Sequence, residues 1–410
     1  MKSILAILLV CIMGEAVANT IVVGKDKAIS TLRLGIHTAK DGDTILLNKG
    51  VYKEGNIIIR KAIHLIGVDQ PILDGELLHE ILTLSGRNIM IRGIKFINAG
   101  YSSMNDFAAI KIIDATNITI ENSSISNSSF AIHIANSTNS IVRNNIIKGN
   151  NKSEHASGNG IHLWKCSTML IENNFIQGHR DGIYLEFVSY SMIKKNHSEK
   201  NIRYGLHFMF SNDDTYQNNV FKNNGAGVAV MYSKKVRMEG NHFEENWGAS
   251  AYGILLKEIK EGSVSNNTFL KNTVGIFMEG SSRLLIEKNV FKNNGWAIKV
   301  QASCDDNNFY NNNFSGNSFD VATNGSISLN KFYKNYWDKY EGYDINKDGI
   351  GDIPYHPVSM YSMIVEQNPY AVMLMRSFTV QLLDKAEKAI PSLTPENLVD
   401  ETPMMKSLKL

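Results

Sequence analysis

The sequence predicts an all-β protein, a right-handed single-stranded parallel β-helix in which each coil of ~22 residues supplies three short strands. Two periodic signals indicate this fold class. A line of Gly, aliphatic, variable and apolar residues recurs at Gly160, Gly182, Gly205, Gly227, Gly253 and Gly275. An Asn recurs with a similar period at Asn145, Asn174, Asn196, Asn219, Asn241, Asn267 and Asn289. Self-similarity at a period of this length is typical of a solenoid.

Short strands, rather than helices, are expected in each coil. Residues pointing inward and outward alternate along each four-residue line, which is the period of a strand. Clusters of Asn, Ser and Gly separate the lines, and these residues favour turns. Parallel strands need a crossover, which each coil supplies by winding round to the next one. The recurring Asn fits an inward-facing turn, where its amide can bond to the Asn residues above and below.

Residues 1–18 are predicted to be a signal peptide. Lys2 supplies a positive charge, residues 4–13 form a short apolar run, and residues 16–18 (Ala-Val-Ala) form a cleavage site. The apolar run is too short to span a bilayer. We therefore expect an exported chain that is cleaved near Ala18.

Two cysteines, Cys166 and Cys304, remain after the signal peptide. Six coils separate them on this interpretation, which is about 30 Å at ~4.8 Å per coil. A disulfide requires the two Cα atoms to lie within about 7 Å of each other. We therefore expect two free thiols, either as small buried side chains or as soft metal ligands.

Residues 19–110 are predicted to form a cap and the first coils. Residues 28–40 have the apolar periodicity of a helix. A solenoid has an open hydrophobic end, so this helix is expected to cover it. Short strands are expected at residues 44–47, 56–59 and 63–67.

Residues 111–340 are predicted to form the main stack, with two longer loops around residues 150–159 and 245–251. In this stack the third residue of each Gly line points outward. The first outward column is His133, His162, Tyr184, His207, Ala229, Leu255, Phe277 and Lys299. The second column, two residues further on, is Trp164, Glu186, Met209, Met231, Lys257 and Glu279.

The columns predict a candidate copper site. Imidazole and thioether groups suit Cu(I) better than Mg²⁺ or Ca²⁺. The candidate ligands are His162, His207, Met209 and Met231. The alternative is that these are ordinary surface His and Met residues of one sheet, which need no ligand.

Residues 341–368 contain a candidate calcium loop. Asp344, Asn346, Asp348, the Ile350 carbonyl and Asp352 match the spacing of oxygen ligands in a calcium-binding loop. The last position of such a loop would be Tyr355 instead of a bidentate Glu. A turn rich in Asp and Asn that binds no metal is the alternative.

Residues 369–391 are predicted to form a C-terminal helix that begins with Pro369. Its first half, which contains Met373, Met375 and Phe378, is apolar nearly all round. We therefore expect it to be buried, either against the end of the solenoid or against another protein. Residues 392–410 are expected to form an extended docking tail or a disordered segment.

The formal net charge of +2 indicates no nucleic-acid partner.

Enzymes that cleave or epimerise polysaccharides are the rival class on this fold, and they need clustered carboxylates. The pairs at residues 213–214 and 305–306 lie four coils apart, roughly 19 Å, and cannot share a site. We therefore expect no catalytic activity. A polysaccharide-processing or sugar-binding solenoid is the alternative.

Several stretches are similar to one known family. They are GNGIHL at 158–163, RDGIY at 180–184, RYGLHFMF at 203–210, GVAVM at 227–231, NYWD at 335–338, the loop at 344–354 and PMMK at 403–406. In these stretches the chain resembles the NosD family, periplasmic maturation factors of nitrous oxide reductase. The resemblance covers nearly the whole mature chain, in order.

The resemblance implies a periplasmic accessory protein for the copper–sulfide centre of nitrous oxide reductase. The implied partners are that reductase, a NosL-type copper chaperone, and an ABC transporter with a NosF-type ATPase and a NosY-type permease. The chain would lie at the membrane surface through the permease. We expect partner contacts at His133, Trp164, Tyr184, Glu186, Met373, Met375, Phe378, Met404 and Met405.

Overall fold

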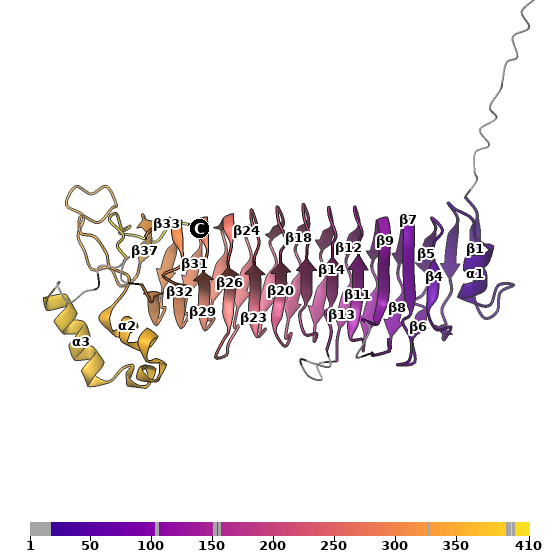
Figure 1. Ribbon diagram of the computed structural model, residues 1–410, viewed down its shortest axis with the longest axis horizontal. Helices are drawn as coiled ribbons and strands as arrows, with labels where there is room; N and C mark the ends of the chain where they lie inside the picture. Colours follow the sequence, from indigo (N-terminus) through magenta and orange to yellow (C-terminus); the bar gives the residue numbers. More distant parts are fainter. Residues whose placement is uncertain are drawn as a thin grey trace, which may run out of the picture.

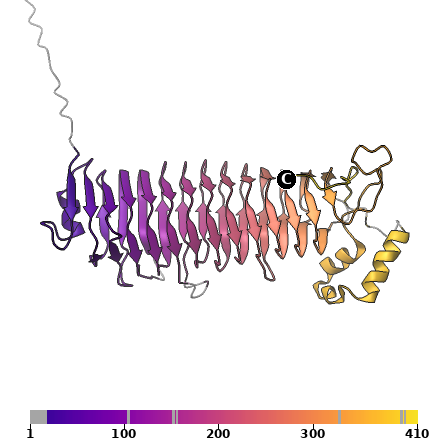
Figure 2. The same ribbon diagram turned by 180° about the vertical axis from the view of Figure 1, so that it is seen from behind.

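The computed structural model describes residues 18–102, 106–150, 154, 157–325, 329–390, 395 and 398–410. The chain winds into an elongated parallel β-solenoid, with a short helix at one end and two longer ones at the other (Figure 1, Figure 2). The predicted fold class is therefore confirmed. The predicted signal peptide, apart from Ala18, lies outside the described residues.

Two of the three strands of most coils join one long sheet. Its strands in the described residues are β1 (Thr20–Val23), β2 (Thr44–Leu47), β4 (Ile57–Ile59), β5 (His64–Gly67), β7 (Leu82–Arg92), β9 (Ala108–Glu121), β11 (Phe130–Ala135), β12 (Ile141–Arg143), β14 (Ile161–Trp164), β15 (Leu170–Glu172), β17 (Ile183–Glu186), β18 (Met192–Lys194), β20 (Tyr204–Met209), β21 (Thr215–Gln217), β23 (Ala226–Met231), β24 (Arg237–Glu239), β26 (Tyr252–Lys257), β27 (Lys260–Ser265), β29 (Val274–Glu279), β30 (Ser282–Glu287), β32 (Trp296–Val300), β33 (Asp305–Tyr310), β35 (Phe319–Thr323) and β36 (Leu329–Tyr333).

The third strand of each coil joins a second sheet. Within the described residues it has 13 strands: β3 (Val51–Tyr52), β6 (Ile72–Asp74), β8 (Lys95–Ile97), β10 (Ser124–Ser126), β13 (Ile146–Lys148), β16 (Phe175–Gln177), β19 (His197–Glu199), β22 (Val220–Lys222), β25 (His242–Glu244), β28 (Thr268–Leu270), β31 (Val290–Lys292), β34 (Asn313–Ser315) and β37 (Tyr336–Trp337).

The helices lie at the two ends. Helix α1 (Leu32–Thr38) covers the N-terminal end, and α2 (Met360–Gln367), the 3-10 helix η1 (Pro369–Leu374) and α3 (Phe378–Ala389) lie at the C-terminal end (Figure 1). The Thr31 hydroxyl accepts a hydrogen bond from the Leu34 N–H and caps α1. None of the helices in the described residues is long and apolar enough to cross a membrane.

Stacked Asn side chains line an inner turn of the solenoid, as the sequence predicts. Asn174 Oδ1 accepts from both the backbone N and the Nδ2 of Asn145, at 3.1 and 3.0 Å. The same pattern continues to Asn335. A second Asn ladder, which the sequence interpretation missed, runs through Asn201, Asn224, Asn246, Asn272, Asn294 and Asn317.

The recurring Gly is required by close packing between coils. A Cβ atom on Gly227 would lie 2.6 Å from the Gly253 carbonyl oxygen. Gly253 meets Gly275 in the same way. Inside this wall, the rings of Phe243, Phe269, Phe291 and Phe314 stack at centroid distances of 4.7–4.8 Å.

Several predicted boundaries differ from the structure. The boundary at residue 110 falls inside β9, because the stack runs without a break from β1 to β37. The predicted helix at 28–40 is shorter, spanning Leu32–Thr38.

The predicted C-terminal helix is divided into η1 and α3, because Met375 is extended and Arg376 has a positive φ of 72°. Its first half is not fully buried either, since Tyr370, Met373 and Phe378 are 82, 84 and 77 % exposed.

The end of the predicted docking tail instead closes the last coil. The Asp400 carboxylate accepts hydrogen bonds from the backbone N and Nδ2 of Asn335 and from Trp337 Nε1, at 3.0–3.1 Å. Isolated β-bridges pair Asp400 with Phe332 and Met404 with Tyr336. Residues 398–410 therefore extend the Asn ladder by one position.

Candidate functional site

Strand pairing places the two predicted outward columns in register. In the first column, His133 pairs with His162, His162 with Tyr184, and Tyr184 with His207. In the second column Trp164, Glu186, Met209 and Met231 pair in succession. We call these eight residues the His–Met face. It is built from β11, β14, β17, β20 and β23, in the middle of the solenoid.

The rings of the first column contact one another in tilted or edge-to-face arrangements. The centroid distance is 4.7 Å from His133 to His162, and 4.8 Å from Tyr184 to both His162 and His207. Tyr184 therefore separates the two imidazoles that the sequence groups in one copper site. At two coils apart, about 10 Å, His162 and His207 are too distant to bind one ion together.

His207 is a buried imidazole with unsatisfied nitrogens. The residue is 5 % exposed, and its Nδ1 lies 3.5 Å from Asp181 Oδ2. Within the described residues neither Nδ1 nor Nε2 has a hydrogen-bond partner. Because buried polar atoms are normally hydrogen-bonded, such a ring is a candidate ligand-binding group.

Asp181 is a fully buried carboxylate beside His207. Arg180 Nε and Arg203 Nε lie 3.9 and 4.0 Å from its oxygens. The Tyr204 backbone N–H donates to it at 3.4 Å. The bond from Tyr204 is long, and the two guanidinium groups lie beyond hydrogen-bonding distance. The two guanidinium groups disfavour a cation at Asp181 itself, and Nδ1 of His207 faces this carboxylate. Nε2 is therefore the nitrogen of His207 that is the better candidate for a ligand.

His133 and His162 form a second imidazole pair. Burial lowers the pKa of His162 to about 3, with smaller contributions from His133 and Arg180. Burial also lowers the pKa of His133. Asn159 Nδ2 lies 3.2 Å from His162 Nδ1. Both rings are therefore neutral near pH 7, the form in which imidazole binds metals.

Met209 and Met231 form a partly exposed thioether pair. They are adjacent in neighbouring strands, and Met209 lies two residues from His207 on the same side of β20. Of the four predicted copper ligands, His207, Met209 and Met231 are therefore neighbours and His162 is not. Among the described residues, no group of three or more His, Cys, Asp or Glu side chains is arranged to hold a metal ion.

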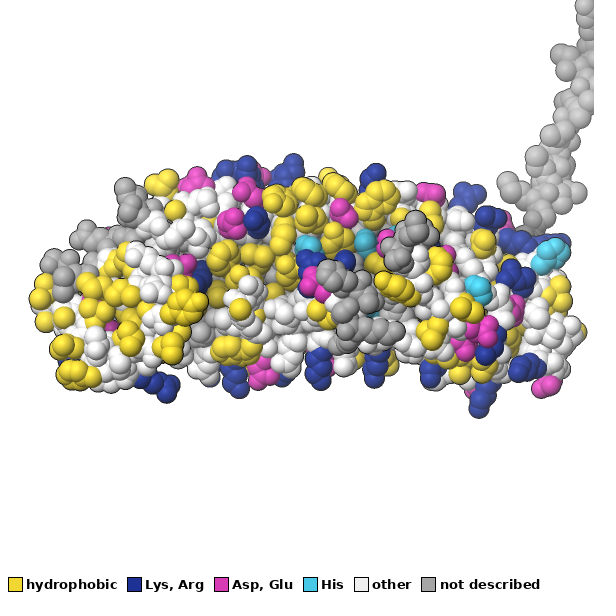
Figure 3. Space-filling model, turned by 60° about the horizontal axis from the view of Figure 1, so that its bottom comes forward, with side chains coloured by type: hydrophobic (Ala, Val, Ile, Leu, Met, Phe, Trp, Pro, Cys, Tyr) yellow, Lys and Arg dark blue, Asp and Glu magenta, His cyan; other side chains and the backbone are white. Residues whose placement is uncertain are grey.

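An exposed aromatic ladder borders the Met pair. Phe187, Phe210 and Tyr232 follow Glu186, Met209 and Met231 in the chain and are 40–47 % exposed. Their rings stack at 5.3 and 5.2 Å, with planes within 18°. The sequence interpretation missed this ladder, although an aromatic residue directly after three successive second-column residues signals it. Figure 3 shows hydrophobic side chains gathered along the middle of the solenoid and at its C-terminal end.

The ladder geometry does not suit a sugar-binding platform. Carbohydrate rings pack on the open faces of aromatic rings, but each inner face here is covered by its neighbour in the stack. The ring edges and the Met side chains form an exposed apolar strip.

The candidate calcium loop is closed by its own hydrogen bonds. Asp344 accepts from the N–H groups of Asp348 and Gly349, and Asp352 accepts from Ile345 N–H. Asp348 accepts from Ile350 N–H at 2.8 Å. The Asp348 bond, to the N–H two residues on, is an Asx-turn bond, and the other three close the loop across four to seven residues. Calcium at Asp344, Asn346, Asp348, Ile350 and Asp352 stays a sequence prediction without support from these contacts.

The two cysteines are free thiols, as predicted. Both are buried, and burial raises the pKa of Cys166 to about 11 and also raises the pKa of Cys304. Cys166 Sγ donates to the Trp164 carbonyl at 3.3 Å. A thiol in this state is a small core side chain rather than a reactive or metal-binding thiolate.

The predicted C-terminal contact residues separate into two groups. Met373 and Phe378 are strongly exposed, whereas Met375 packs against the cluster that contains Tyr361 and Val380. Met404 and Met405 lie in the segment that closes the last coil, where Met404 N–H donates to the Asn335 carbonyl at 2.9 Å. Met373 and Phe378 are thus the most exposed of these side chains and the most accessible to a partner.

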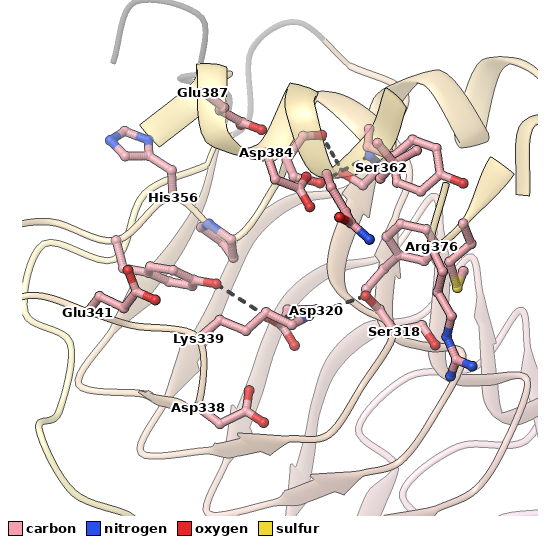
Figure 4. Close-up of a pocket in the computed structure, with 18 residues that line it drawn as sticks. Ser318, Asp320, Asp338, Lys339, Glu341, His356, Ser362, Arg376, Asp384 and Glu387 are labelled. Carbon is pink, nitrogen blue, oxygen red and sulfur yellow. Dashed lines mark hydrogen bonds and ion pairs between the residues drawn. The ribbon is translucent and has the colours of Figure 1, made fainter. Parts of the chain in front are cut away.

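A cavity of about 840 Å³ lies between the last coils and helices α2 and α3. We call it the C-terminal cavity. Its polar lining includes Ser318, Asp320, Asp338, Lys339, Glu341, His356, Ser362, Arg376, Asp384 and Glu387 (Figure 4).

The fold and the His–Met face define a β-solenoid binding protein. The chain belongs to the NosD family, whose sequence model is described as "Periplasmic copper-binding protein (NosD)" and matches residues 55–201 and 145–349. The resemblance predicted from the sequence is confirmed. The family supports a periplasmic location and an association with copper, and it is a family of binding proteins rather than known enzymes.

Two relatives carry the same name, "Probable ABC transporter binding protein NosD". The one from Pseudomonas aeruginosa is 28 % identical over 92 % of this chain and 94 % of its own length. The one from Stutzerimonas stutzeri is 31 % identical over 113 residues, and the match spans about a quarter of each chain, 27 % of this one and 26 % of the relative.

Two solved structures with the same fold are carbohydrate-cleaving enzymes. An exopolygalacturonase of Yersinia enterocolitica has a TM-score of 0.55 at 10 % identity, covering 77 % of this chain and 78 % of its own. An α-1,3-glucanase of Streptomyces thermodiastaticus has a TM-score of 0.59 at 11 % identity, covering 75 and 65 %. At these identities the likeness concerns the fold alone.

Proposed function

We propose that this protein assists assembly of the copper–sulfide centre of nitrous oxide reductase in the periplasm. In this proposal it is exported by a signal peptide cleaved near Ala18 and has no catalytic role. It works beside an ABC transporter with a NosF-type ATPase and a NosY-type permease, through which it lies at the membrane. A NosL-type chaperone supplies copper. Membership of the NosD family and the relatives' names support this proposal.

The observation that carries the proposal is the soft ligand set around His207. Within the described residues neither ring nitrogen of His207 has a hydrogen-bond partner, and the thioethers of Met209 and Met231 are its neighbours on the same face. One imidazole and two thioethers suit Cu(I). The partly exposed Met pair gives copper a route to the surface, and the aromatic ladder beside it offers a contact surface for the chaperone or the reductase.

The proposal is tested by changing the three ligands together. We expect His207→Asn with Met209→Leu and Met231→Leu to weaken anaerobic Cu(I) binding to the mature chain at least tenfold, measured against a competing chelator. In a host whose own NosD-type protein is deleted, the same variant should yield reductase with less copper in its copper–sulfide centre.

His162→Asn is the matched control, because it removes an imidazole from the same column but outside the proposed set. Thermal unfolding must show that both variants are folded. Unchanged Cu(I) affinity in the triple variant would remove the site. Full copper content in reductase made with no NosD-type protein present would refute the assembly function itself.

A further inference from the structure

The C-terminal cavity carries an excess of carboxyl groups. Helix α3 contributes Asp384 and Glu387 on one side, and the last coils contribute Asp320 and Asp338 on the other, with Glu341 nearby (Figure 4). Lys339 and Arg376 are the cationic side chains of the lining. Five carboxyl groups thus surround a space that holds two fixed positive charges.

Lys339 is already engaged within the cavity wall. Its Nζ lies 3.3 Å from Asp320 Oδ2 and donates to the carbonyls of Asn317 and Ser318 at 2.9 and 3.2 Å. It is therefore unable to neutralise the carboxyl groups on α3. In the part of the chain that the structure describes, no Lys or Arg forms an ion pair with Asp384 or Glu387, so the negative charge of α3 faces the cavity.

Asp320 places an unsatisfied oxygen at the wall of the cavity. The residue is 3 % exposed, and Tyr355 OH donates to its Oδ2 at 3.3 Å. Within the described residues its Oδ1 has no hydrogen-bond partner. A buried carboxylate oxygen normally has one, so the described residues leave the charge of Asp320 incompletely compensated at the wall of the cavity.

The pKa values of two carboxyl groups in the cavity are raised. Burial raises the pKa of Asp320, and Asp338 adds to this effect against the opposing effect of Lys339. Burial also raises the pKa of Glu387, with a contribution from Asp384. A positive charge placed between these groups would lower both pKa values.

We propose that the C-terminal cavity receives a Lys or Arg side chain of the transporter permease. This inference rests on the proposed function, in which the chain binds such a transporter. Two features favour a protein side chain over a free amine. The cavity is larger than one ammonium group needs, and the segment that bounds it carries the exposed apolar side chains of Tyr370, Met373 and Phe378. A basic side chain in the cavity with apolar contacts around it is a typical interface arrangement.

The test removes the charge without changing the shape of the cavity. Asp384→Asn with Glu387→Gln keeps the side-chain sizes, and the new amide oxygen at position 387 can still accept from the Met360 N–H, as the Glu387 carboxylate does at 3.1 Å. We expect capture of the detergent-solubilised permease–ATPase complex by the full mature chain to fall at least fivefold at low salt. Raising the salt concentration should weaken capture by the wild type more than capture by the variant.

Glu239→Gln with Glu258→Gln is the control, since it removes two exposed charges from coils away from the cavity. Equal melting temperatures would exclude misfolding. A third variant, Met373→Ser with Phe378→Ser, tests the apolar contact independently of the charge.

The outcomes separate the two proposals. Loss of capture in the Met373/Phe378 variant with full capture in the Asp384/Glu387 variant would overturn the cavity inference and leave the transporter interaction standing. Failure of the wild type to capture the transporter would instead refute the proposed function. Calorimetry with spermidine tests for a small-amine site. If spermidine binds the wild type tightly but not the Asp384/Glu387 variant, and both capture the transporter equally well, the cavity binds small amines and the inference is overturned.

Discussion

Asn219 shows how one side chain links three coils. Its Oδ1 accepts from the backbone N and Nδ2 of Asn196, and its Nδ2 donates to the Ile193 carbonyl and to Asn241 Oδ1, all at 2.9–3.0 Å. Inside the solenoid these bonds satisfy backbone groups that no strand partner reaches. The period of the Asn residues in the sequence therefore reports a hydrogen-bond requirement of the turn.

Asp214 occupies an inward position, where a carboxylate lacks the N–H donor that an Asn side chain has. Its Oδ1 accepts from Ser191 N–H at 2.8 Å, whereas within the described residues its Oδ2 has no hydrogen-bond partner. Burial raises the pKa of Asp214 to about 7. In a later coil Asn307 stands at the equivalent position, and it donates its Nδ2 to the Ser281 carbonyl at 2.9 Å.

We therefore predict that Asp214→Asn stabilises the protein. The folded chain holds the Asp214 proton more tightly than the unfolded chain, so wild-type stability falls as pH rises from about 4 to 7. The advantage of the variant should grow over that window to on the order of 2–4 kcal/mol and stay constant above it. Chemical denaturation at pH 5 and pH 8 measures this.

Asp213→Asn is the control for Asp214→Asn, because Asp213 is half-buried and already in the left-handed conformation that Asn tolerates. An equal gain in stability at both pH values would contradict the assignment to a buried carboxyl group.

At the scale of elements, the C-terminal segment closes the solenoid. The fully buried Asp400 continues the Asn ladder at Asn335 and also accepts from Trp337 Nε1. Without it, the last coil would leave three N–H donors unpaired. An element that the sequence suggests is a loose tail is thus a structural cap, as solenoid ends require.

We predict that Asp400→Ala lowers the free energy of unfolding by about 3–5 kcal/mol, because it removes a charged acceptor from three buried donors. Residues 398–410 should then become sensitive to limited proteolysis, followed by mass spectrometry. Asp400→Asn, which keeps one acceptor oxygen, should cost less. The exposed Glu401→Ala is the control, and an equal loss in it would argue against the cap.

At the scale of the whole molecule, the solenoid is a stack of similar coils, and the two proposed functional regions lie in different parts of it. The His–Met face lies in the middle coils and the C-terminal cavity at one end. Because each coil contacts only its neighbours, stability should be roughly additive along the stack. The long axis separates the proposed copper site from the proposed transporter contact, so each can be changed with little effect on the other.

We predict that removal of one whole coil, residues 268–289, preserves the fold. Val290 would take the place of its pairing partner Thr268, and Phe291 that of Phe269 in the ring stack. Small-angle X-ray scattering should show a particle about 5 Å shorter, with the circular dichroism signal per residue unchanged. Removal of residues 268–278, half a coil, should disrupt folding. If the whole-coil deletion failed to fold while the half-coil deletion folded, the stability of the stack would not be additive over its coils.

The local periodicity of the sequence determined the fold class and the arrangement of each coil. The Gly lines, the Asn repeats and the alternation of residues predict three strands per coil, the inward and outward positions, and the register of the two columns. This follows because register in a solenoid repeats at the period of the sequence, so one coil defines the next. The family could also be identified from the residues of these coils.

The tertiary structure decided what the period does not encode. It left His207 without hydrogen bonds to the described residues, and it joined Asp400 to Asn335 of the last coil, 65 residues away in the chain. It also divided the C-terminal helix at Arg376 and formed the acidic cavity from α3 and the last coils. These features depend on contacts between segments that share no repeat, and such contacts follow from packing in three dimensions rather than from the order of residues in one coil.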